Sequence, residues 1–336
     1  MTLIKQINNL VRLPSLFFFV RRCYRRQKQF MKETILSDLE DFKKHNDHIL
    51  TEQDFYKIKF YYGLAVPAIG EMYSLLRAKE FTPFERKTLT YLGSITGLFD
   101  DFFDEAETPE SHLKEMINNP NLETVRNSKE RLFIRFYLQA LEQNHSRTIK
   151  KYFNAGLEAQ VQSKKQKNSS LSSEEIYKIT RQKGGTFILL YRAGLEGNIP
   201  EPEEDLLFQI GLLGQLENDI FDIYKDHVAG ISTLATTSKS ILTLRSRYHT
   251  ILNDVYELID KMDFPKKNKM KFSRLFALIA SRGLVCLNQL QKLEKNRVFE
   301  ISGYSRMQLI CDMGTFRNII SWVGFYLSWN KNRHGN

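Results

Sequence analysis

Residues 91–105, YLGSITGLFDDFFDE, pass from an apolar stretch directly into four carboxylates, those of Asp100, Asp101, Asp104 and Glu105. The apolar positions repeat with the period of a helix. On that helix Asp100 and Asp104 project from one face, a single turn apart, and like charges at this spacing repel each other. The stretch therefore predicts a helix whose last turn carries negative charge that something must compensate.

The helical period extends over most of the 336 residues, and almost no segment alternates as a strand does. Capping-box patterns begin at Thr51 and Ser172, while Pro83 and Pro265 fall where a first helical turn tolerates proline. We expect helices at residues 33–48, 52–80, 83–104, 129–144, 147–163, 173–193, 203–226, 239–262, 266–296 and 304–329. Hydrophobic residues make up 42% of the chain, which is ample for one large core. We therefore predict a single all-α domain at residues 33–336.

Positive charge is concentrated at the N-terminus. Residues 1–32 contain no acid and eight basic residues, which are Lys5, Arg12, Arg21, Arg22, Arg25, Arg26, Lys28 and Lys32. They account for eight of the ten net positive charges, so the rest of the chain is nearly neutral and a nucleic-acid partner is not expected. Residues 1–32 are predicted to form a basic amphipathic arm, which either contacts an anionic membrane surface peripherally or is a solvated face.

The sequence also bears on the location of the protein. No apolar run reaches the ~18 residues that span a bilayer, and SLFFFV at residues 15–20 is too short for a signal-peptide core. Cys23, Cys286 and Cys311 show no paired metal-site spacing and cannot form a full set of disulfides. We expect a cytoplasmic protein with reduced, structural cysteines, either a monomer or a homodimer.

A second acidic cluster lies in GLLGQLENDIFDIYKD, residues 211–226. Asn218, Asp222 and Asp226 recur at i, i+4 and i+8 and form one oxygen-bearing stripe on a helix, while leucines and isoleucines supply the packing face. Gly211 and Gly214 remove side chains where another helix or a ligand can approach the stripe. Such a stripe is either a solvated face or a set of ligands for a hard cation.

The two clusters together favour one kind of chemistry. Mg²⁺ prefers oxygen ligands, usually takes one or two carboxylates, and completes its octahedron with water and substrate phosphate. A diphosphate ester of a hydrocarbon suits carboxylate walls with apolar and aromatic surroundings. Metal ions take up the charge that develops as the C–O bond breaks, aromatic faces stabilise the allylic carbocation, and the exclusion of water protects it from premature quenching. The expected cofactor is therefore Mg²⁺, and the expected substrate is a diphosphate ester of a hydrocarbon.

Both segments are similar to the metal-binding motifs of class I terpene synthases. DDFFD at 100–104 resembles the DDxxD motif, and NDIFDIYKD at 218–226 resembles the motif in which Asn, Ser or Thr, and Glu recur at i, i+4 and i+8 with Lys before the Glu. The resemblance implies an all-α isoprenoid synthase bundle around a central active-site cavity, and ionisation and cyclisation of a linear prenyl diphosphate. It implies three Mg²⁺ ions and the ligands Asp100, Asp101, Asp104, Asn218, Asp222 and Asp226. Five of these are implied as catalytic, namely Asp100, Asp104, Asn218, Asp222 and Asp226.

Departures from the pattern leave a second enzyme class open. Asp222 stands where Ser or Thr is usual, and Gln215, Asn218, Asp222 and Asp226 follow the pattern of squalene and phytoene synthases, which couple two prenyl diphosphates head to head. Chain-elongating synthases are not favoured, because EAETPES follows the first motif instead of paired arginines. A non-catalytic helical scaffold is the third alternative.

Several basic and aromatic residues are candidates for substrate contacts. Those for the diphosphate are Arg181, Lys183, Lys225 and Arg297, although Arg181 and Lys183 do not match the family's spacing and Arg297 lacks the Tyr that usually follows. Gly184 and Gly185 can interrupt the helix beside them and aim a carbonyl into the cavity. Phe99 and Phe187 are the candidates for the cavity wall, with a place in the hydrophobic core as the alternative.

Overall fold

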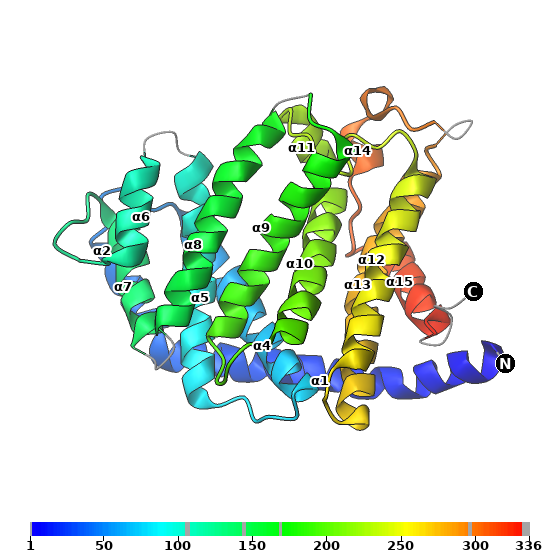
Figure 1. The fold of residues 1–336 in the computed structure, drawn as a ribbon, viewed down its shortest axis with the longest axis horizontal. Helices are drawn as coiled ribbons and strands as arrows, with labels where there is room; N and C mark the ends of the chain where they lie inside the picture. The colour runs from blue at the N-terminus through cyan, green and yellow to red at the C-terminus, as the bar shows by residue number, and fades with distance from the viewer. Residues whose placement is uncertain (1, 105–107, 143–145, 168–169, 295–297, 331–336) are drawn as a thin grey trace. The chain divides into compact units, whose positions relative to one another are not determined.

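The computed structural model describes residues 2–104, 108–142, 146–167, 170–294 and 298–330 (Figure 1). Helices dominate these residues, and none of them belongs to an extended strand, which confirms the all-α prediction. The chain divides into two compact units. We call Phe17–Val161 with Thr186–Pro200 the amino-terminal unit, and Met1–Leu16 with Gln162–Gly185 and Glu201–Asn336 the carboxy-terminal unit.

Helix α5 (Pro83–Asp104) is the centre of the amino-terminal unit and packs against α4, α7 and a π-helical segment, η1. The other elements of this unit are α2 (Leu36–Lys44), α3 (Glu52–Tyr56), η1 (Lys57–Tyr62), α4 (Gly63–Leu76), α6 (Glu110–Asn118), α7 (Ser128–Leu141) and most of α8 (Ser146–Ser163). Leu89, Leu92 and Ile95 of α5 are fully buried. Gly93 permits the close approach of the preceding helices, since a Cβ there would lie 2.8 Å from the carbonyl oxygen of Tyr62.

Helix α13 (Lys266–Gln291) packs against α10, α12 and α15 in the carboxy-terminal unit. The other elements that lie wholly in this unit are η2 (Lys164–Lys167), α10 (Glu201–Phe221), α11 (Ile223–Val228), α12 (Ile241–Lys261), the short η3 (Ile301–Gly303), α14 (Arg306–Leu309) and α15 (Phe316–Ser328). Helix α9 (Ser173–Ala193) contributes its first half to this unit and its second half to the other.

The predicted arm is a single helix, α1 (Thr2–Thr34), which also contributes to both units. Its inner side chains recur with helical spacing, and Leu16, Cys23, Gln27 and Met31 are almost completely buried. Gln27 donates hydrogen bonds to the carbonyl oxygen of Gly63 and to the hydroxyl of Thr90. The inner face of the arm is thus part of the packed core.

Most of the predicted helices are present, with shifted ends. The helices expected at 83–104 and 173–193 begin and end where they were predicted, and the capping boxes at Thr51 and Ser172 are both formed. The prediction was wrong at 304–329, where residues 310–315 separate α14 from α15. It also missed α6.

Two further findings concern membrane-spanning segments and cysteines. No helix among the described residues combines the length and the hydropathy of a membrane span. Cys23, Cys286 and Cys311 are all buried, free thiols.

Candidate functional site

The second acidic motif lies at the junction of α10 and α11. Helix α10 ends at Phe221, but the amide of Asp222 donates to the carbonyl of Asn218 (2.8 Å), and the amide of Asp226 donates to that of Asp222 (2.9 Å). Helical hydrogen bonding therefore continues across the junction. The interruption at Asp222 corrects the prediction of one helix at 203–226, while Asn218, Asp222 and Asp226 still follow one another along one side.

The side chains of this motif differ in exposure. Asn218 and Lys225 are exposed, Asp222 is half-buried, and Asp226 is only 9% exposed. Burial and the charge of Asp222 together raise the pKa of Asp226 to about 6, against the opposing effect of Lys225 and Lys183. The motif thus combines carboxylates that repel one another with two nearby ammonium groups.

Asp219 is a third acid of this cluster, beside Asp222 and Asp226, and was not predicted from the sequence. It is 4% exposed, and burial raises its pKa to about 7 despite a 2.8 Å hydrogen bond from the amide of Gln215. Its Oδ2 atom is buried and has no hydrogen-bond partner among the described residues. The i, i+3 and i+7 spacing of Asp219, Asp222 and Asp226 is a signal that could have identified it.

Lys183 approaches the cluster from α9, close enough to lower the pKa of both Asp219 and Asp226. Two glycines bring its helix there: a Cβ on Gly184 would lie 2.0 Å from the carbonyl oxygen of Gly211 in α10. The prediction that Gly184 and Gly185 interrupt their helix is wrong, because α9 continues unbroken through both residues. The glycines serve close packing of α9 against α10.

Arg181, one turn before Gly185 on α9, also lies against α10. Its guanidinium is 4.8 Å from the ring centroid of Phe208, the same ring that a Cβ on Gly185 would meet at 2.0 Å. The aromatic face holds the arginine by cation–π attraction.

The first motif belongs to the amino-terminal unit, and its two adjacent aspartates have different partners. Asp100 accepts a 2.5 Å hydrogen bond from the Gln160 amide of α8. Asp101 accepts from the ammonium of Lys57 at 3.1 Å. Burial and the neighbouring Asp54 raise the pKa of Asp101, against the effect of Lys57. Neither Lys57 nor Gln160 was predicted as a partner, because neither lies near the motif along the chain.

Phe99 and Phe187 contact each other within an aromatic cluster of this unit. Their ring centroids are 6.2 Å apart, and Phe99 also contacts the rings of Phe103, Phe133 and Phe153. Phe99 is 1% exposed, whereas Phe187 is partly exposed. Phe99 therefore contributes to the packed core.

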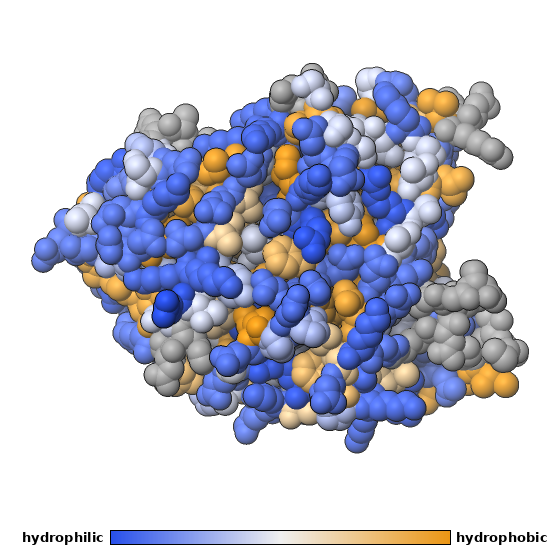
Figure 2. Space-filling view, viewed as in Figure 1, coloured by the Kyte–Doolittle hydropathy of each residue, from blue (hydrophilic) through white to orange (hydrophobic). Residues whose placement is uncertain are grey.

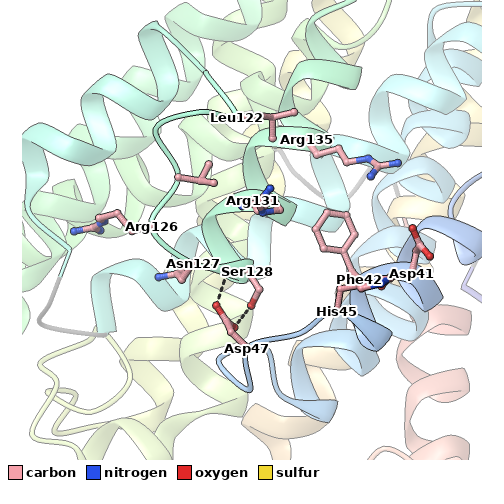
Figure 3. Close-up of a pocket in the computed structure, with 11 residues that line it drawn as sticks. Asp41, Phe42, His45, Asp47, Leu122, Arg126, Asn127, Ser128, Arg131 and Arg135 are labelled. Carbon is pink, nitrogen blue, oxygen red and sulfur yellow. Dashed lines mark hydrogen bonds between the residues drawn. The ribbon is translucent and has the colours of Figure 1, made fainter.

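A pocket of approximately 510 Å³ lies elsewhere in the amino-terminal unit, between α2 and α7 (Figure 3). None of the predicted site residues lines it. Asp47 accepts a 2.8 Å hydrogen bond from the amide of Ser128 in the first turn of α7, and Arg131 and Arg135 of the same helix also line the pocket. The carboxylate of Asp47 thus takes the position that an anion takes at a helix N-terminus.

Arg297 and the side chain of Asp104 lie outside the described part of the chain. Within that part, no group of three or more His, Cys, Asp or Glu side chains is arranged to hold a metal ion. The chain matches no protein-family model, and no curated protein or solved structure is significantly similar to it.

Proposed function

We propose that this protein is a Mg²⁺-dependent terpene cyclase that ionises a linear prenyl diphosphate. The observation that supports it best is the carboxylate cluster of Asp219, Asp222 and Asp226, which Lys183 faces from α9. The buried Oδ2 of Asp219 lacks a hydrogen-bond partner within the described residues, and a cation beside it would satisfy that oxygen.

The donor set fits magnesium in its chemistry. All the candidate ligands are oxygen atoms, and Mg²⁺ commonly takes one or two carboxylates and keeps water and phosphate as its other ligands, so it does not need a cage of three acids. When bound, Mg²⁺ neutralises the diphosphate and acts as a Lewis acid toward it. We propose Asp100, Asp104, Asn218, Asp222 and Asp226 as the residues that hold it, with Asp101 kept in place by Lys57.

The bond that breaks joins C1 of the prenyl chain to the diphosphate oxygen. Its electron pair leaves with the diphosphate. The π electrons of another double bond of the same chain then attack the allylic cation, which forms a C–C bond and moves the positive charge along the chain. The cyclic cation finally loses a proton to a base such as the released diphosphate and gains a new C=C bond. Lys183 and Lys225, with Arg181, supply positive charge for the departing diphosphate. The proposal requires both motifs to act on the same diphosphate.

Thermal unfolding with Mg²⁺ and inorganic diphosphate tests this function. A ligand that binds the native state alone stabilises it by about 2.7 kcal/mol at roughly 100 times its Kd. We expect Tm to rise when both are present, and Asp226→Asn and Lys183→Gln to abolish the rise. Asp254→Asn is the matched control, since Asp254 lies on α12 and pairs with Gln209. An unchanged Tm in the wild-type protein would favour the non-catalytic scaffold.

Head-to-head coupling of two prenyl diphosphates is the second candidate function. Asp222 favours head-to-head coupling, because Asp at this position follows the pattern of squalene and phytoene synthases, whereas class I terpene synthases usually carry Ser or Thr there. In the structure the amide of Gln215, another residue of that pattern, donates to Asp219. Products of doubled carbon number would assign this function.

A further inference from the structure

The outer face of α1 changes character along its length. Exposed hydrophobic side chains occupy its N-terminal half, and they are Ile4, Ile7, Leu10, Val11, Phe17 and Phe18. Ile4, Ile7, Val11 and Phe18 recur at i, i+3, i+7 and i+14, on the side of the helix opposite the buried Leu13 and Leu16. An apolar stripe of α1 therefore faces outward (Figure 2 shows hydrophobic atoms at the N-terminal end of this helix).

The same side of α1 becomes cationic after Phe18. Arg21, Arg25, Lys28 and Lys32 continue the stripe at i, i+4, i+7 and i+11, and all four are exposed. None of the four has a hydrogen bond or ion pair with another of the described residues. Their charge is thus available to a partner.

Other basic residues of α1 have a structural role, which sets the four apart. Arg26 forms an ion pair with Glu71 at 3.2 Å, and the guanidinium of Arg22 lies 5.5 Å from the ring centroid of Phe19. The helix therefore uses some of its positive charge for internal contacts and leaves one row of it on the outer face.

We propose that the outer face of α1 docks on an anionic phospholipid bilayer. Interfacial helices bury apolar side chains about 5–10 Å into the boundary between headgroups and acyl chains, while Lys and Arg meet the lipid phosphates. Because the apolar and cationic residues of α1 lie on one side of one helix, a flat anionic surface contacts both at once. This inference does not depend on the proposed enzymatic function.

Two other partners fit this face less well. A nucleic acid would use the cationic row but leave Ile7, Val11 and Phe18 exposed to water. A second copy of the chain would place cations against cations in a parallel pairing, and cations against apolar side chains in an antiparallel one.

Flotation of the full-length protein with vesicles tests the proposal. We expect it to bind vesicles made of equal parts of phosphatidylcholine and phosphatidylserine, to bind phosphatidylcholine alone weakly, and to dissociate as salt concentration rises. The triple variant Arg21→Gln, Arg25→Gln and Lys28→Gln should lower the partition constant by about 100-fold, because each basic residue near such a surface contributes about a factor of five.

Matched variants distinguish the effect of this face of α1 on vesicle binding from the effect of losing any exposed charge or any exposed hydrophobic side chain. Lys164→Gln, Lys165→Gln and Lys167→Gln together remove three exposed charges elsewhere and should leave binding unchanged. Phe18→Ser should weaken binding, whereas Phe316→Ser, at a similarly exposed residue of α15, should not. Circular dichroism and Tm would verify that each variant is folded.

Four results would overturn the proposal. The first is failure of the wild-type protein to float with the anionic vesicles. The second and third are an equal loss of binding in the two triple variants and equal binding of the wild-type protein to the two lipid mixtures. The fourth is that the wild-type protein forms dimers, and that Phe18→Ser abolishes the dimer but leaves vesicle binding unchanged.

Discussion

Gly184 of α9 and Gly211 of α10 face each other in direct backbone contact. A Cβ on Gly211 would lie 2.4 Å from both the carbonyl carbon and the carbonyl oxygen of Gly184. This contact holds the helix that carries Lys183 against the helix that carries Asp219. The carboxylate cluster and the ammonium facing it therefore depend on two residues that have no side chains.

A pair of alanine substitutions on α10 tests the contact. Gly211→Ala should destabilise the protein by about 1–3 kcal/mol, because backbone atoms of α9 cannot rotate away from the added methyl group. Gly214→Ala should stabilise it by up to about 1 kcal/mol through helix propensity, because a Cβ there meets no described atom within 4 Å outside its own helix. Urea unfolding measures both, and equal effects would contradict the packing described.

A double-mutant cycle tests whether the two acidic motifs act as one site. Asp100→Asn and Asp226→Asn should each lower kcat by several orders of magnitude, and combining them should cost little more, because groups that act as a unit are strongly non-additive. Asp254→Asn provides the control acid, with kcat near the wild-type value. Additive losses from the first two substitutions would mean that the motifs act independently.

The Asp47 contact with α7 predicts a pH-dependent stability. Burial acts to raise the pKa of Asp47, but hydrogen bonds from the side chain and amide of Ser128 outweigh it, so its pKa lies below the ordinary value. The stabilisation that ionised Asp47 gives to the folded protein is therefore complete above about pH 5. It is lost as the pH falls through the pKa that Asp47 has in the folded protein.

Replacement of Asp47 by Asn measures that stabilisation. Asp47→Asn should cost about 0.3–1 kcal/mol at neutral pH and nothing in strong acid, since Asp47 is exposed and its charge is partly screened. Asp41→Asn is the control, because the Asp41 side chain lines the same pocket and has no partner among the described residues. Urea unfolding across the acid range gives the comparison, and a difference that persists in strong acid would exclude the carboxylate charge as its source.

Substitution of Glu71 should lower the free energy of unfolding of the protein strongly. Glu71 accepts from Arg86 at 2.7 Å and from Arg26 at 3.2 Å, and both Glu71 and Arg86 are buried. Glu71→Gln leaves a buried guanidinium without its counter-charge, which should cost about 3–5 kcal/mol. The exposed pair of Lys43 and Glu52 is the comparison, where Glu52→Gln should have a far smaller effect in the same unfolding assay. Similar losses from the two variants would be inconsistent with this burial.

The sequence predicted the helices well because their signals are local. The helical period of apolar residues, the capping box at Thr51 and the helix-starting Pro83 are signals that each involve only a few neighbouring residues. Helices α5 and α9 accordingly begin and end at the predicted residues. The same reasoning joined α14 to α15, because their apolar period continues across residues 310–315. Local signals thus identify helices more reliably than the breaks between them.

Partners far apart in the chain could not be predicted in the same way. Lys57 pairs with Asp101, and Gln160 pairs with Asp100, only because α5 packs beside η1 and α8 folds back toward it. Gly184 looked like a helix interruption because its contact, Gly211, lies on another helix. Such contacts are decided by tertiary packing, which sequence period and capping do not encode.

Product analysis tests the central claim most directly. The full-length protein should be incubated with Mg²⁺ and, in separate reactions, with farnesyl, geranylgeranyl and geranylfarnesyl diphosphate, and the hydrocarbons identified by mass spectrometry. We predict that at least one substrate yields a cyclic hydrocarbon of unchanged carbon number together with free diphosphate, and that Asp226→Asn yields neither. Intact substrate in all three reactions, with no diphosphate released, would contradict the account.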